Sequence, residues 1–259
     1  MLKIQGLNTH YGAIHALKGI DLEIHKGEVV SLIGSNGAGK STLLNSIAGN
    51  IDVDSGRIYN NGRDITYEKE YKRARYIGRL YQDPLKGTAP HMTIEENLGL
   101  AFSRGKRMRL GFGVRKSDRV YFKEVCKKLG LGLETRLTSE VGLLSGGQRQ
   151  ALTLLMATLE TPELLLLDEH TAALDPKTAA KVLELTQQIV AEDQLTTLMI
   201  THNMKDALRY GNRLIMLHEG RILFDVPQEK KEGLTTRDLL SMFEQAAGSE
   251  LASDSLLLS

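Results

Sequence analysis

The sequence has little of several residue types, and each shortage excludes a class of protein. Its 259 residues include one cysteine, Cys126, so no disulfide forms within the chain, which is typical of a reducing compartment. A net charge of +1 provides no global field that would attract nucleic acid. No apolar run approaches the roughly 20 residues of a membrane-spanning helix, and residues 1–6 favour a strand over a signal peptide. The composition therefore predicts a cytosolic chain, whose 41% hydrophobic content is enough for a packed core.

The most informative feature that is present is a phosphate-binding loop at residues 34–42. Its glycines let backbone N–H groups face phosphates, its lysine adds a charge, and its serine hydroxyl suits Mg²⁺. A β-rich run at 28–33 precedes the loop and a helical pattern at 41–48 follows it, which is the context that this motif requires. The residues predicted to bind nucleotide here are Gly34, Ser35, Asn36, Gly37, Ala38, Gly39, Lys40, Ser41 and Thr42.

A second feature is the run of four leucines at 164–167, which ends in Asp168 and Glu169. Such a run is typical of a buried parallel strand, and these strands end at the edge of a sheet where ligands bind. We expect Asp168 to hold Mg²⁺, directly or through water. Glu169 is the candidate to orient or deprotonate the attacking water.

A third feature is the segment Leu144-Ser-Gly-Gly-Gln148, which precedes a long helical stretch. Ser145 is a favoured N-cap, and the two glycines expose the first N–H groups of that helix, so the segment forms a second anion site. One nucleotide does not need two such sites from one chain. The pattern therefore indicates that a second copy supplies one of them.

With these motifs, the sequence resembles the ATP-binding cassette (ABC) ATPases over residues 1–225. The segment 144–148 matches the family signature letter for letter. The resemblance implies that the chain hydrolyses ATP with Mg²⁺ as a two-copy assembly, with Glu169 and His202 as catalytic residues. It also implies that the signature contacts the nucleotide of the other copy through Ser145, Gly146, Gly147 and Gln148.

The resemblance assigns roles to residues that their patterns alone leave open. Tyr11 matches the aromatic residue that stacks on adenine, although without the family it would be interpreted as a core or edge-strand tyrosine. Gln82 matches the glutamine that senses Mg²⁺ and the γ-phosphate and begins the contact region for a membrane partner. Asp175 lies in the loop that crosses to the other copy. His202 matches the switch histidine, where a lone histidine is otherwise more often a surface or core residue. The implied metal ligands are Ser41, Gln82 and Asp168.

One residue departs from the family pattern, because His170 stands where the family usually has proline. We expect this to be tolerated, since Asp168 and Glu169 keep their positions, although a histidine so close to Glu169 can shift the titration of that carboxyl. The stretch 168–175 and the overall layout resemble bacterial cassettes that import amino acids, tryptophan or tyrosine among them.

The predicted fold is α/β: a P-loop NTPase core with a mostly parallel sheet and helices, an N-terminal antiparallel β-subdomain and an inserted α-helical subdomain. Period-two patterning at 16–24 indicates the antiparallel sheet. Residues 83–158 contain three helical stretches and no strand pattern, and strands alternate with helices again after 164. The predicted domains are 1–225, with the helical insertion at 83–158, and 226–259, a C-terminal extension. A capped amphipathic helix there is expected to dock on the core or on a second copy through Leu239, Leu240, Met242 and Phe243.

The stretch from Arg104 to Lys123 is rich in positive charge. It is either a solvated basic loop or a patch that faces the membrane partner or anionic lipid heads. DNA binding is disfavoured, since no aromatic interleaving accompanies the charge. The basic residues are Arg104, Lys106, Arg107, Arg109, Arg115, Lys116, Arg119 and Lys123.

The resemblance implies several partners for a cassette on the cytoplasmic face of a membrane. These are a second copy or a paralogous cassette, a separate transmembrane permease, and an extracytoplasmic substrate-binding protein, with no nucleic acid. The seven histidines lack zinc-ligand spacing, so no metal besides Mg²⁺ is expected.

Import is favoured over export because separate-chain cassettes with this insertion are typical of importers. A soluble cassette that acts on ribosomes or DNA is disfavoured by the single cassette and the lack of a long heptad run. A non-hydrolytic cassette would lack Glu169, His202 or the signature, and a simple phosphate-loop kinase would not need the signature.

Overall fold

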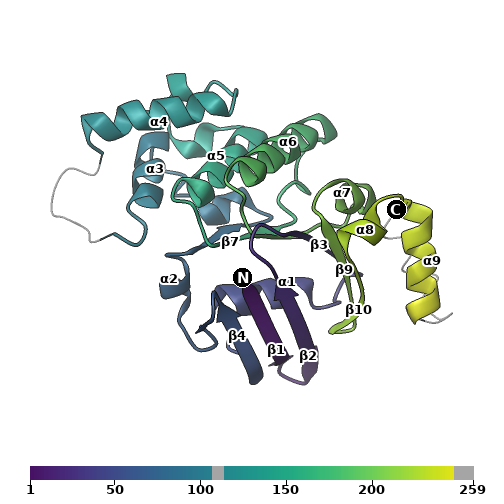
Figure 1. Cartoon of the computed structure of the whole chain (residues 1–259). Coiled ribbons are helices and arrows are strands. Elements are labelled where there is room, and N and C mark those ends of the chain that lie inside the picture. The colour runs from purple at the N-terminus through teal and green to yellow at the C-terminus, as the bar shows by residue number, and fades with distance from the viewer. Residues whose placement is uncertain (107–113, 248–259) are drawn as a thin grey trace. The chain divides into compact units, whose positions relative to one another are not determined.

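The computed structural model describes residues 1–106 and 114–247, which form two compact units (Figure 1). The first unit contains residues 1–73, 166–168 and 195–247, and the second contains residues 74–165 and 169–194. Strand β7 (Leu164–Asp168) is the only element whose residues belong to both units among those described. Each unit is built around its own apolar interior.

The first unit begins with an antiparallel sheet, as the period-two pattern predicts. Its strands have the order β2-β1-β4-β5. In β1 the side chains of Leu2, Ile4 and Leu7 are buried, and the polar residues between them are more exposed. The strands are β1 (Leu2–Tyr11), β2 (Ile14–Ile24), β4 (Ser55–Asn60) and β5 (Arg63–Asp64).

The second sheet of this unit has the order β10-β9-β3-β8-β7. Strand β3 pairs in parallel with β8 and with β9, whereas β10 pairs antiparallel with β9. The parallel strands are apolar and buried along nearly their whole length, which is typical of sheets covered on both faces. The strands are β3 (Val29–Ile33), β8 (Thr197–Ile200), β9 (Arg213–His218) and β10 (Arg221–Val226).

The helices of the first unit are short, and the buried side chain of Arg73 contacts the C-terminal end of the first of them, α1. They are α1 (Lys40–Ala48), α2 (Glu70–Arg73), α7 (Met204–Arg209), α8 (Gln228–Lys231) and α9 (Thr236–Ala247). The guanidinium of Arg73 is 2% exposed and donates to the carbonyl oxygens of Ser46 and Ile47 at 2.7 and 2.8 Å. It also donates to the carbonyl oxygens of Thr66 and Glu68, each at 2.8 Å. Arg73 therefore provides hydrogen-bond donors for carbonyl oxygens in the last turn of α1, which have no partners within the helix.

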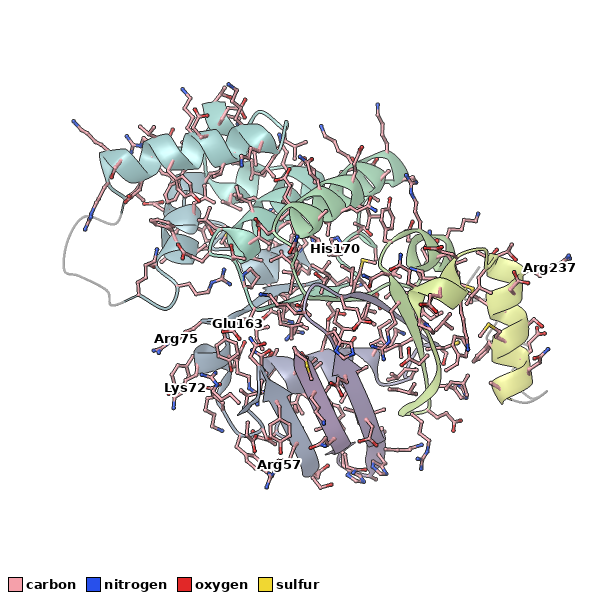
Figure 2. The ribbon with its side chains drawn as sticks, in the orientation of Figure 1. Arg57, Lys72, Arg75, Glu163, His170 and Arg237 are labelled. Atoms are coloured by element: carbon pink, nitrogen blue, oxygen red, sulfur yellow. The ribbon has the colours of Figure 1, made fainter. Side chains whose placement is uncertain are left out.

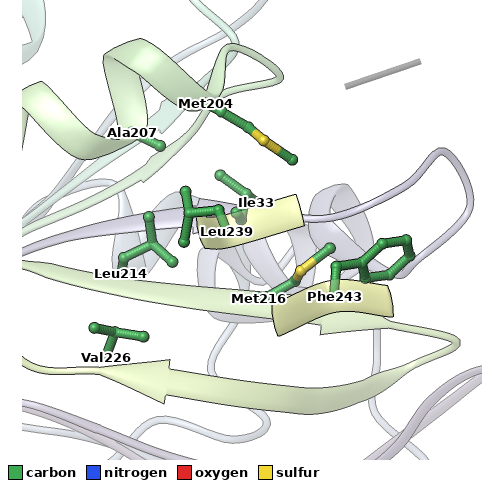
Figure 3. Packing of buried hydrophobic residues seen from close by; sticks show 8 residues of the cluster. All are labelled: Ile33, Met204, Ala207, Leu214, Met216, Val226, Leu239 and Phe243. Atoms are coloured by element: carbon green, nitrogen blue, oxygen red, sulfur yellow. The ribbon is translucent and has the colours of Figure 1, made fainter. Parts of the chain in front are cut away.

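The C-terminal helix α9 docks on the core of its own unit, which decides between the two expectations for it (Figure 3). Leu239 and Phe243 are fully buried in a cluster, while Leu240 and Met242 pack against it. Burial of a side chain of this size stabilises by about 1.5–3 kcal/mol. The cluster consists of Ile33, Met204, Ala207, Leu214, Met216, Val226, Leu239 and Phe243.

The second unit is mainly helical, with β6 beside the start of β7. Phe122 and Cys126 of α4 are fully buried, and burial raises the pKa of the Cys126 thiol to about 12, so this cysteine behaves as a small apolar residue. The regular elements are β6 (Ile77–Leu80), α3 (Ile94–Phe102), α4 (Lys116–Lys128), α5 (Gly146–Thr158) and α6 (Pro176–Glu192), with 3₁₀ turns η1 (Pro84–Gly87), η2 (Leu133–Thr135) and η3 (Val141–Leu143).

Within the described ranges, no helix combines the length and the apolar character needed to cross a membrane.

Candidate nucleotide site

The phosphate loop connects β3 to α1, and its glycines are required by the backbone around them. A Cβ on Gly34 would collide with the carbonyl oxygen of Leu217 in β9. A Cβ on Gly39 would lie 2.7 Å from the carbonyl oxygen of Ala16, and Gly39 has φ +102. Because the obstacles are backbone atoms, a side chain at either position forces the loop out of place. The loop is thus wedged between β2 and β9 with its N–H groups at the start of α1.

The loop offers positive potential to a ligand at that helix start. Gly39 is the N-cap of α1 and makes no side-chain capping hydrogen bond, and no acidic residue lies in the first turn. The Lys40 side chain is 5% exposed, and its ammonium donates to the carbonyl oxygens of Gly34 at 2.7 Å and Ser35 at 3.0 Å. A buried ammonium and uncapped helix N–H groups together favour an anion such as a phosphate.

Two further predicted residues come from strands of the same sheet in the same unit. Asp168 is the last residue of β7, and His202 follows β8 by two residues. Strands β3 and β8 pair in parallel, so the phosphate loop and His202 both follow the carboxyl end of their strand at one edge of the sheet. Asp168 is the last residue of β7, the neighbour of β8 in the order β3-β8-β7. Asn203 is the N-cap of α7, and its side chain accepts from the N–H groups of Lys205 and Asp206.

Glu169 has a strained backbone at the point where β7 ends. Its φ of +46 lies in the left-handed region, which costs of order 1–3 kcal/mol for a residue that is not glycine. A turn follows, closed by the hydrogen bond from the Ala172 N–H to the Glu169 carbonyl at 3.0 Å. Strain of this kind persists only where surrounding contacts hold it.

His170 is the residue that stands in place of the family's proline, and it points into the protein. It is 2% exposed, and its Nε2 lies 3.1 Å from the hydroxyl of Thr186 in α6. Figure 2 labels His170 among the side chains drawn on the ribbon. Burial lowers the pKa of His170 to about 4, so its imidazole is neutral near pH 7. His170 is therefore uncharged in the turn beside Glu169 at neutral pH.

Tyr11 lies at the tip of the β1–β2 hairpin. Its side chain is 47% exposed, which leaves a ring face accessible to a flat ligand. Its cross-strand partner is Ile14, and the next pair, His10 and His15, stack with ring centroids 4.0 Å apart. Asp54 accepts hydrogen bonds from the His10 backbone N–H at 2.7 Å and contacts its ring at 2.9 Å, which fixes the base of the hairpin tip.

The signature segment belongs to the second unit and begins α5. Ser145 is the N-cap, as predicted: its hydroxyl accepts from the Gln148 N–H at 3.3 Å, and the Gln148 side chain accepts from the Ser145 N–H at 3.2 Å. A Cβ on Gly147 would collide with Cγ2 of Thr178 in α6. Asp175 is the N-cap of α6 and accepts from the Thr178 N–H at 3.1 Å.

Thr178 thus contacts both Gly147 of the signature and Asp175, although no sequence pattern singles it out. Nothing in the sequence around Thr178 distinguishes it from an ordinary helix residue. Gln82 is exposed in the same unit, between β6 and η1.

Three residues of the basic stretch make intramolecular contacts, so part of its charge is paired or satisfied within the chain. Arg104 donates to the carbonyl oxygens of Met156 and Ala157 at 3.1 and 3.0 Å, and burial lowers its pKa. Lys106 pairs with Glu160 at 2.7 Å, and Arg119 pairs with Glu95 through two hydrogen bonds of 2.5 Å. The remaining described basic residues are exposed: Arg115, Lys116 and Lys123. Arg107 and Arg109 lie outside the described residues, as do the last ten residues of the chain.

Comparisons with known proteins find relatives over most of the chain. A family model described as "ABC transporter" matches residues 17–172. The chain is 47% identical over 251 residues to a tyrosine transport ATP-binding protein of Clostridioides difficile (strain R20291), covering 95% of this chain and 100% of that protein. It is 35% identical to the thiamine import ATP-binding protein ThiQ of Yersinia pseudotuberculosis, covering 88% of this chain and 91% of that one.

Solved structures of ATP-binding cassettes have the same fold. The ADP conformation of the cassette MJ1267 matches with a TM-score of 0.78 at 25% identity, covering 94% of this chain and 98% of that chain. A dimeric post-hydrolysis state of the cassette MJ0796, bound to ADP and Pi, matches with a TM-score of 0.74 at 29% identity, covering 88% and 99%.

Proposed function

The chain belongs to the ABC transporter family of ATPases, and from that premise we propose how its residues divide the work of binding and hydrolysing ATP. The expected fold and the ATPase activity are those of the family, whose cassettes dimerise and drive a membrane permease. The observation that supports the proposal is the sheet order β3-β8-β7, in which the phosphate loop follows β3, His202 follows β8 by two residues, and Asp168 ends β7.

The phosphate loop residues 34–42 hold the phosphates, and Tyr11 stacks on the adenine. Ser41, Gln82 and Asp168 hold Mg²⁺, and their hydroxyl, amide and carboxylate oxygens suit this hard cation, which needs few protein ligands when phosphates supply the others. When bound, Mg²⁺ offsets the charge of the phosphate oxygens. Glu169 accepts a proton from the attacking water, and His202 donates to the γ-phosphate.

A second copy supplies Ser145, Gly146, Gly147 and Gln148 to the γ-phosphate, and Asp175 lies at the same interface. Residues 1–225 form the cassette, with 83–158 as the helical subdomain that receives the permease near Gln82, and 226–259 form an appended tail. The exposed side chain of Leu85 in η1, close to Gln82 in sequence, supports a docking role there.

The transported solute is a small amino acid, with an aromatic one such as tyrosine as the first candidate. The similarity to the tyrosine transport protein over nearly the whole chain supports this choice. The system works by import, with an extracytoplasmic binding protein, and the cassette lies on the cytoplasmic face of the membrane.

The test is the Glu169→Gln variant of the full chain, with Mg-ATP. We expect the ATPase turnover number to fall by roughly 10²–10⁴-fold while ATP still binds, because the amide cannot accept the water proton. Glu163 directly precedes β7, as Glu169 directly follows it, so Glu163→Gln is the matched glutamate-to-glutamine control. Normal turnover by Glu169→Gln rules out the assigned base.

A further inference from the structure

The turn after β7 is attached to α6 by one buried polar contact. His170 and Thr186 are 2% and 5% exposed, and the two side chains meet at 3.1 Å between Nε2 and Oγ1. Both residues belong to the second unit, as does Glu169. A buried polar pair has a fixed geometry, because neither group can turn to water instead.

The direction of this hydrogen bond follows from the proton count of the threonine hydroxyl. The Thr186 hydroxyl donates its single proton to the Val182 carbonyl oxygen at 2.8 Å, one helical turn earlier. Towards His170 the same oxygen is therefore an acceptor, so the proton of the imidazole is on Nε2. Two successive hydrogen bonds therefore connect His170 to the backbone of α6, one from Nε2–H to the Thr186 hydroxyl and one from that hydroxyl to the Val182 carbonyl.

The residue attached in this way directly follows Glu169, whose φ of +46 is strained. The family's usual proline does not suit this conformation, because proline pushes the preceding residue towards extended backbone with negative φ. The hydrogen bond from Ala172 to Glu169 closes the other side of the turn. A histidine at position 170 is thus compatible with the left-handed backbone of Glu169, whereas a proline is not.

We propose that His170 and Thr186 are positioning residues: their buried hydrogen bond holds the turn so that the carboxylate of Glu169 is aimed at the attacking water. This inference depends on the proposed role of Glu169 as the base. It assigns the hold on this turn to a side-chain hydrogen bond with α6.

The first measurements are steady-state ATPase kinetics of full-length variants with Mg-ATP. His170→Leu removes the donor and Thr186→Val removes the acceptor, each at similar volume. We expect each variant to lower kcat by about tenfold, because small displacements of a catalytic group reduce the rate steeply. The ATP affinity is expected to stay within about twofold, because the phosphate loop belongs to the other unit. An unchanged kcat in Thr186→Val contradicts the proposal, even if His170→Leu fails to fold.

Two control variants separate positioning from general stability. Thr158 in α5 is also buried and donates to the Leu154 carbonyl at 2.9 Å, so Thr158→Val removes the same kind of bond from another helix and should leave kcat unchanged. His170→Gln keeps an N–H three bonds from Cβ, as in histidine, and should restore kcat to within about threefold of the unchanged chain. An equal loss in Thr158→Val, or no rescue by glutamine, contradicts the proposal.

The decisive comparison repeats His170→Leu in the Glu169→Gln background. If His170 acts through the carboxylate of Glu169, its removal should reduce the residual rate no further. A drop by the same factor in both backgrounds means that the pair only stabilises the fold, and the inference is wrong. Normal turnover in Glu169→Gln alone is a different failure, because it removes the proposed function itself.

Discussion

The phosphate loop and the signature segment are both glycine-rich and both lead into a helix, yet the N-termini of the two helices are capped differently. The helix after the phosphate loop begins at Gly39, which provides no side-chain cap. The helix after the signature begins at Ser145, which forms a capping box with Gln148. A phosphate at the signature therefore competes with the protein's own cap, whereas a phosphate at the loop meets uncapped N–H groups and the buried ammonium of Lys40.

This difference explains why the phosphate loop can bind nucleotide alone and the signature segment cannot. We infer that the signature contributes measurable affinity only when a phosphate is already held by the loop of another copy. The following variants test this difference.

The largest contrast is in ATP affinity of the single chain. Lys40→Ala removes a charged donor, so its Kd for ATP should rise more than about tenfold, since hydrogen bonds to charged groups contribute about 1.5–3 kcal/mol. Ser145→Ala should leave this Kd unchanged and lower the rate of hydrolysis. Calorimetric titration with ATP at low protein concentration measures both. An equal rise in the Kd for ATP in both variants would contradict the proposed difference between the two motifs.

The second contrast concerns the glycines. Gly34→Ala places a Cβ against the backbone carbonyl of Leu217, so we expect a loss of about 3 kcal/mol or more of unfolding free energy. Gly147→Ala meets only the Cγ2 methyl of Thr178, and should lose about 1–3 kcal/mol. Denaturant unfolding measures both.

Thr178→Ser removes the methyl group and should rescue Gly147→Ala, while no side-chain change is expected to rescue Gly34→Ala. If Thr178→Ser leaves Gly147→Ala as unstable as before, the steric account of the signature glycine is mistaken.

The third contrast is the contribution of the caps to stability. Ser145→Ala should lower the free energy of unfolding by about 1 kcal/mol, because the Gln148 N–H loses its acceptor. Ser41→Ala in the first turn of α1 should change stability far less, since no capping bond is lost there. Thermal unfolding of the two variants is the measurement, and a larger shift for Ser41→Ala would refute the capping difference.

The smallest effect is a pH dependence on the signature side. Hydrogen bonds from Thr178 lower the pKa of Asp175, so the Asp175 cap of α6 stabilises the fold above the carboxyl's unfolded pKa and is lost as pH falls through its folded pKa. Asp175→Asn should remove this acid dependence and keep a cap at neutral pH. Unfolding curves recorded from neutral to acid pH compare the two chains, and identical acid dependence would exclude a role for Asp175.

The sequence was sufficient for features that depend on local pattern. The strand–loop–helix around residues 34–42, the cap at Ser145 and the apolar stripe of α9 all follow from residues close together in the chain, and the structure confirms them. The family fold followed from the same motifs.

Contacts between distant residues could not be predicted in the same way. The partner of His170 lies 16 residues away, on a helix whose pattern gives no reason to single out Thr186. The partners of the basic stretch were equally out of reach, because Arg104, Lys106 and Arg119 contact carbonyls or carboxylates 24 to 54 residues away in the sequence.

The central claim is that ATP lies between the phosphate loop of one copy and the signature of another. The most direct measurement is sedimentation of two inactive chains with Mg-ATP, Lys40→Ala/Glu169→Gln and Ser145→Arg/Glu169→Gln, alone and mixed. The account predicts that each chain alone stays monomeric, and that the mixture forms a dimer with one ATP, since only one composite site is intact. Dimers of the Ser145→Arg chain alone, or no dimer in the mixture while Glu169→Gln by itself dimerises, would contradict it.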